Sequence, residues 1–213
     1  GEKGYGCYYR PRHTEYPADQ RDAIRRKELA DIRAHGGDHL LGLWGIDIRK
    51  DGDSVQIDYE DLRNGFRELQ DMGFEGPYIA SDRLHHLARL LDLEADEVGE
   101  SEKMRRVAER ALQGLHRLRK EEGFPEIVVA HMDEVFNRGR LPLYIALTKV
   151  IRRVAPELRV YITIHSRPDP TVRRMTRRID PYVDLRCYHG HSIGLWMAAG
   201  HRIEELEREL KES

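Results

Sequence analysis

The feature that most constrains the fold is a repeated pattern: an amphipathic helix, a glycine that ends it, and a short apolar strand. The clearest copy covers residues 101–122, where apolar residues recur at steps of three and four. Ser101 can cap the start of this helix, Gly123 suits a left-handed residue at its end, and Pro125 prevents continuation. The apolar strand Ile127–Met132 follows at once. This pattern predicts an α/β fold.

The same pattern recurs along the chain. Further helices are predicted near residues 18–35, at Tyr59–Met72, near 142–154 and near 170–178. Strands are predicted at Gly6–Tyr9, His39–Trp44, Pro77–Ala80, Ile127–Met132, Arg159–Ile164 and Val183–Tyr188. Apolar strands joined by helical crossovers indicate a parallel sheet covered by helices. A TIM-type barrel and an open doubly wound sheet both fit this order.

Polar residues at the ends of the predicted strands favour the barrel. They are Asp47, Asp82, Asp133 with Glu134, His165, and Tyr188 with His189. A barrel gathers all these ends around one mouth, where barrel enzymes carry out their chemistry. An open nucleotide-binding sheet would show a glycine-rich phosphate loop after its first strand, whereas Arg10-Pro11-Arg12-His13 follows here. We therefore predict a TIM-type (β/α) barrel.

The number of predicted strands is too small to close such a barrel, which needs eight. We expect residues 1–213 to form a single partial (β/α)-barrel domain with about six of the eight βα units. The last predicted helix runs to Ser213, where a seventh strand would be due. We expect the chain to be a fragment of a longer one that supplies the missing strands, and the oligomeric state stays open.

Composition narrows the classes of partner. The formal net charge of −2 predicts no general affinity for nucleic acid or anionic membranes, and no apolar run is long enough to span a bilayer. Cys7 and Cys187 are too few for a disulfide framework, and both fall in predicted strands as buried thiols. The sequence predicts no cofactor and leaves the cellular compartment open.

The Asp133-Glu134 pair is the strongest chemical signal. It follows a strongly apolar strand, where desolvation and mutual repulsion are expected to raise the pKa of one carboxyl group. A carboxyl group that stays protonated near neutral pH can donate its proton to a glycosidic oxygen. The alternative is structural: either residue can cap the next helix or pair with an arginine.

The runs around this pair resemble a known family. VVAHMDE, APEL and RVYITIH in the second half of the chain are similar to the barrel of family 123 glycoside hydrolases. RRKELADIRAHGGDHLLGLWG and IDYEDLRNGFRELQDMGFEGPYIASD resemble the opening units of the same barrels. The resemblance implies a β-N-acetylgalactosaminidase in which the sugar's own 2-acetamido oxygen attacks the anomeric carbon. Asp133 would orient the acetamido group, and Glu134 would be the general acid/base.

Other residues are candidates for binding a carbohydrate substrate. Tyr188 is placed to hydrogen-bond the acetamido oxygen as charge develops there, and Trp44 or Tyr78 to stack on a sugar face. Asp82 and His165 are candidate ligands of sugar hydroxyls because they end predicted strands. Core packing is the alternative for Trp44.

Two other functions fit the sequence. A metal-dependent barrel isomerase or hydrolase would use a mixed ligand set: His131, His165, His189 and His191 with the Asp133-Glu134 pair. No tight ligand spacing supports it, and His85-His86 is expected on the exposed face of a helix. The other function is a non-catalytic barrel that only binds carbohydrate.

Overall fold

The structure is a computed structural model, and it describes residues 5–8, 15–41, 44–52, 54–132, 135, 140–164 and 178–188. The helices are α1 (Ala18–Ala34), α2 (Glu60–Asp71), α3 (Leu84–Leu90), α4 (Glu102–Glu122), α5 (Leu141–Val154) and the 3₁₀ helix η2 (Asp180–Tyr182). The strands are β1 (Tyr5–Tyr8), β2 (Gly37–Leu41), β3 (Asp47–Asp51), β4 (Ser54–Asp58), β5 (Tyr78–Ser81), β6 (Ile127–Ala130), β7 (Arg159–Ile164) and β8 (Leu185–Tyr188). Each of the six predicted strands has a counterpart among them.

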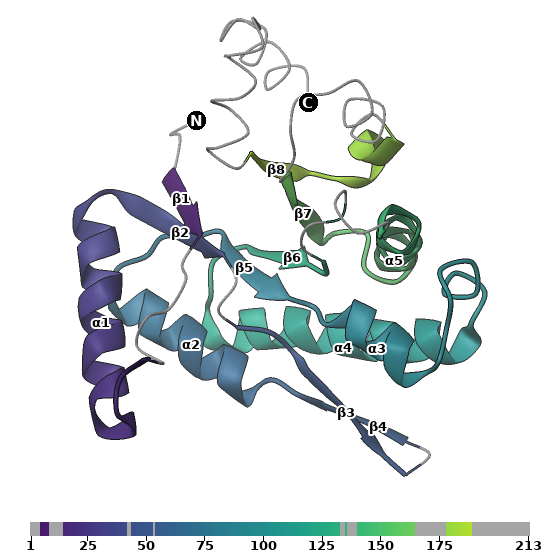
Figure 1. Cartoon of the computed structure of the whole chain (residues 1–213), viewed down its shortest axis with the longest axis horizontal. Coiled ribbons are helices and arrows are strands. Elements are labelled where there is room, and N and C mark those ends of the chain that lie inside the picture. Colours follow the sequence, from purple (N-terminus) through teal and green to yellow (C-terminus); the bar gives the residue numbers. More distant parts are fainter. Residues whose placement is uncertain are drawn as a thin grey trace, which may run out of the picture.

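The strands form three sheets. β1 and β2 are a parallel pair, β3 and β4 an antiparallel hairpin, and β5-β6-β7-β8 a four-stranded parallel sheet in chain order. Figure 1 shows the hairpin projecting from the rest of the fold. One isolated bridge, Gly45 to Ser81, links the segment after β2 to β5. There the Ser81 N–H donates to the Trp44 carbonyl (3.0 Å), and the Ile46 N–H donates to the Ser81 carbonyl (2.9 Å).

Helix α4 confirms the end signals in the sequence. The Ser101 hydroxyl accepts a hydrogen bond from the Met104 N–H at 3.2 Å, which satisfies one of the free donors of the first turn. Gly123 ends the helix with φ +68°, a left-handed conformation that glycine adopts without steric cost. The apolar stripe of α4, including Leu112 and Leu115, is buried. Local sequence therefore sets both ends and the buried face of this helix.

Side chains of the four-stranded sheet alternate between two faces, as the pleat requires. Tyr78 and Ala80 of β5 and Val129 of β6 pack into the large core that the helices share. Ile79, Val128 and Tyr161 form a separate small cluster on the other face. Asp82 comes two residues after Ala80, and His131 two residues after Val129. Both continue this alternation and are therefore directed toward the helices.

The predicted barrel is wrong, although the α/β class is confirmed. In a closed barrel every strand pairs on both sides, in one continuous ladder. Among the described residues the six predicted strands instead divide into a pair and a sheet of four, and no ladder closes. The hairpin β3–β4, which was not predicted, follows β2 in the chain. The helix–strand pattern is local, and it does not specify which strand ladders join.

None of the described helices combines the length and hydrophobicity needed to cross a membrane. The helix predicted near 170–178 falls almost wholly outside the described residues, as does the C-terminal helix.

Candidate functional site

A buried aspartate lies at the end of β5. Asp82 is fully buried, its Oδ1 accepts a hydrogen bond from the Leu84 N–H at 2.9 Å, and this contact helps to start α3. The Asp82 N–H donates to the Ala130 carbonyl at 3.3 Å. The backbone and side chain of Asp82 thus join the carboxyl ends of β5 and β6 to the start of a helix.

The second carboxylate oxygen of Asp82 faces His131, the residue after β6. Oδ2 lies 3.5 Å from His131 Nδ1, and both side chains are completely inaccessible to solvent. The separation suits an ion pair and is too long for a strong hydrogen bond. Neither atom has a hydrogen-bond partner within the described part of the chain. A buried pair of this kind depends on each partner being present, because a lone buried charge or dipole is costly.

Helix α5 holds the other side of the His131 ring. The Thr148 hydroxyl donates its single proton to the Tyr144 carbonyl at 2.9 Å and lies 3.1 Å from His131 Nε2. The hydroxyl oxygen is therefore the acceptor and Nε2–H the donor. The Tyr144 ring stacks on the imidazole at 4.3 Å, and burial, with Asp82 nearby, raises the pKa of Tyr144.

His85 adds a pH-dependent element beside this pair. It is half-buried rather than exposed, and burial lowers its pKa below 6.5 despite the neighbouring Asp82 carboxylate. The unfolded chain then binds more protons than the folded one as pH falls through 6.5, so the stability decreases there.

We expect urea unfolding midpoints to drop between about pH 7.5 and about pH 5, and to drop less for His85→Asn than for the wild type. The matched control is His35→Asn, at the exposed end of α1. An equal drop in His85→Asn and the wild type would exclude this role for His85.

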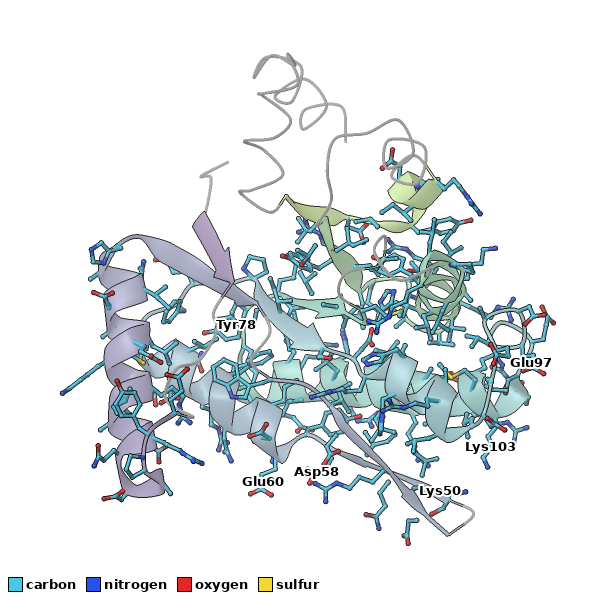
Figure 2. The ribbon with its side chains drawn as sticks, in the orientation of Figure 1. Lys50, Asp58, Glu60, Tyr78, Glu97 and Lys103 are labelled. Carbon is cyan, nitrogen blue, oxygen red and sulfur yellow. The ribbon has the colours of Figure 1, made fainter. Side chains whose placement is uncertain are left out.

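The predicted substrate-binding residues are placed differently. Tyr78 is 2% exposed and its hydroxyl donates to the Phe74 carbonyl at 3.0 Å; burial raises its pKa to about 12. Figure 2 shows it within the body of the fold, with Lys50 toward the far end of the hairpin. Trp44 packs edge to face on Phe66 (6.3 Å) of α2. No hydrogen bond or ring contact links either side chain to Asp82 within the described part of the chain.

The remaining predicted residues are not described in side-chain detail. Asp133, Glu134 and His165 lie outside the described residues, and of Tyr188 the structure describes only the backbone, in β8. Sequence reasoning missed Thr148 and Tyr144. The signal was present in part, because a threonine interrupts the apolar face of the predicted helix over 142–154.

Within the described ranges, no three His, Cys, Asp or Glu side chains are grouped so that they could hold a metal ion. The histidines at 165, 189 and 191 lie outside those ranges, so the metal hypothesis stays a prediction. No protein-family model matches this chain, and no curated protein shows significant similarity to it. The resemblance to family 123 glycoside hydrolases accordingly also stays a prediction.

Proposed function

We propose that this chain is a glycoside hydrolase that cleaves N-acetylhexosamine-containing glycans, with Glu134 as general acid/base and Asp133 orienting the acetamido group. The observation that supports it is the position of β6, which pairs with β5 on one side and β7 on the other. The Asp133-Glu134 pair follows β6 after His131-Met132 in the sequence. Ligands of open α/β sheets bind outside the carboxyl ends of such strands.

The anchoring of His131 also supports the proposal. Its ring is fixed by Thr148, Tyr144 and Asp82, and β6 is tied to β5 by the Asp82 N–H. A catalytic carboxyl group works only if the surrounding residues keep it within a fraction of an ångström of its productive position. Asp133 and Glu134 follow His131 by two and three residues in the sequence. A fixed His131 restricts the positions open to these carboxyl groups more than a mobile residue would.

The proposed reaction has two balanced steps. First, the acetamido carbonyl oxygen bonds to the anomeric carbon, the glycosidic C–O bond breaks, and Glu134 gives its proton to the departing oxygen. Asp133 orients the acetamido N–H of the resulting oxazolinium ring. Water then bonds to the anomeric carbon, the ring C–O bond breaks, and Glu134 takes the proton of water. No separate protein nucleophile is needed, which makes adjacent carboxylates acceptable.

The acetamido group itself provides the test. We expect the chain to hydrolyse nitrophenyl β-N-acetylgalactosaminide and to leave nitrophenyl β-galactoside intact, because only the first carries the internal nucleophile. Release of nitrophenol measures both rates, before and after dialysis against a chelator. Equal hydrolysis of both substrates, hydrolysis of neither, or loss of activity with the chelator would contradict the proposal.

A further inference from the structure

A cavity of about 170 Å³ lies between α1 and α2. Its lining comprises two arginines of α1, the tryptophan that follows β2, and one face of α2: Arg25, Arg26, Trp44, Asp61, Asn64 and Glu68. The spacing of 61, 64 and 68 places these three side chains on the same side of the helix. Neither Asp82 nor His131 lines this cavity.

The charged groups of the cavity largely neutralise one another. Glu68 is 8% exposed, and its Oε1 accepts a hydrogen bond from Arg25 Nη2 at 3.2 Å. Its carboxylate also forms ion pairs with Arg25 (Nε to Oε2, 2.9 Å) and Arg26 (Nε to Oε1, 3.5 Å). With Asp61 included, the lining carries two positive and two negative charges. The cavity therefore has no net charge that would attract an anion or a cation. The contacts with Glu68 hold the side chains of Arg25 and Arg26 in position.

The groups left to contact a ligand are the indole of Trp44, the amide of Asn64 and the carboxylate of Asp61. A Cβ at Gly65 would overlap the Trp44 indole, so glycine lets the ring lie directly on α2. Within the described part of the chain, the Trp44 indole N–H, the Asn64 amide and the Asp61 carboxylate have no hydrogen-bond or ion-pair partner. The indole offers an apolar face and an N–H donor. The Asn64 amide can donate and accept hydrogen bonds, and the Asp61 carboxylate accepts them.

We propose that this cavity binds one neutral, hydroxyl-rich sugar ring, the pyranose of an N-acetylhexosamine unit, against Trp44. Sugar hydroxyls both donate and accept hydrogen bonds, which suits the donors and acceptors of Asn64 and Asp61. The equal numbers of positive and negative charges in the lining disfavour an ionic ligand. A volume of about 170 Å³ suits a single ring. The hydroxyl-rich class follows from the lining alone, whereas the choice of N-acetylhexosamine rests on the proposed function.

The indole N–H of Trp44 is a direct reporter of this site. The chain has two tryptophans, so Trp44→Phe identifies the Trp44 signal in a nitrogen–proton NMR spectrum. Titration with N-acetylgalactosamine is expected to move that signal with saturation, at a dissociation constant on the order of 1 mM. Sodium sulfate at equal concentration is expected to leave it in place.

Variants of the exposed lining residues test the assignment without disturbing the fold. Asn64→Ala and Asp61→Ala should each weaken binding about five- to tenfold, the equivalent of one lost hydrogen bond. Gln113→Ala, an exposed amide on α4, is the matched control and should bind as the wild type does.

The proposal would be overturned by a Trp44 signal that does not respond to the sugar or that responds to sulfate. It would also be overturned if Asn64→Ala and Asp61→Ala bound the sugar as tightly as the wild type does. The readout is independent of turnover. Sugar binding without hydrolysis would support the cavity assignment and contradict the proposed hydrolase. Hydrolysis without a response of the Trp44 signal would support the hydrolase and contradict the cavity assignment.

Discussion

Glu134→Gln is expected to lower kcat toward aryl β-N-acetylgalactosaminides by about 10²- to 10⁴-fold, the range that a positioned proton donor contributes. Glutamine keeps the shape of the side chain but can neither give a proton to the departing oxygen nor take one from water. The loss should grow as the leaving group becomes more basic, because a poor leaving group depends more on protonation. Initial rates with nitrophenyl and alkyl glycosides measure both effects.

Two variants make this experiment specific. Asp133→Asn should also slow hydrolysis, but by a similar factor for both leaving groups, because its role is to orient the acetamido group. Glu121→Gln, at an exposed position on α4, controls for loss of one carboxylate and should leave kcat unchanged. Unchanged turnover in Glu134→Gln would remove Glu134 from the acid/base role.

Asp82→Ala is expected to destabilise the fold by about 3–5 kcal/mol, the usual cost of removing one member of a buried pair. The substitution leaves the buried His131 Nδ1 without its counterpart and takes away the acceptor for the Leu84 N–H. Urea unfolding followed by circular dichroism measures the change. Asp96→Ala, at an exposed position, should change stability little.

Two further variants separate the contributions of Asp82. Asp82→Asn keeps an acceptor for Leu84 and should cost less than Asp82→Ala. Adding His131→Leu to Asp82→Ala should recover part of the loss, because an apolar side chain replaces the ring that had lost its partner. If Asp82→Ala unfolds at the same urea concentration as the wild type, the pair contributes nothing to stability.

Several elements of the fold were predictable because their causes are local. Ser101 and Gly123 set the ends of α4, and the apolar stripe between them sets its buried face. Apolar runs such as Ile127–Met132 likewise indicated the six parallel strands, because strands of parallel sheets are typically continuous apolar runs. The hairpin β3–β4 was missed although Asp51-Gly52 is a typical hairpin turn and Val55-Gln56-Ile57 alternates apolar with polar residues. The mostly polar composition of Asp47–Asp58 hid this short signal beside the apolar runs of the other strands.

The candidate sites were only partly predictable. Asp82 was singled out at a strand end and His131 as a candidate metal ligand. Their contact, and the part played by Thr148, depend on β5, β6 and α5 being brought together. Trp44 was predicted as a sugar-stacking residue or a core residue. It is packed on Phe66 and also lines the cavity with Arg25, which is far away in the sequence.

The sequence by itself determined the helix ends, the apolar strands, the α/β class and the position of Asp133-Glu134 after β6. These features depend on residues within one or two turns of each other, so a local pattern carries them. Only the tertiary structure decided that the ladders do not close into a barrel, that Asp82 faces His131, and that Trp44 lies over Gly65. Those outcomes are set by strand pairing and side-chain packing between distant segments, which no local pattern records.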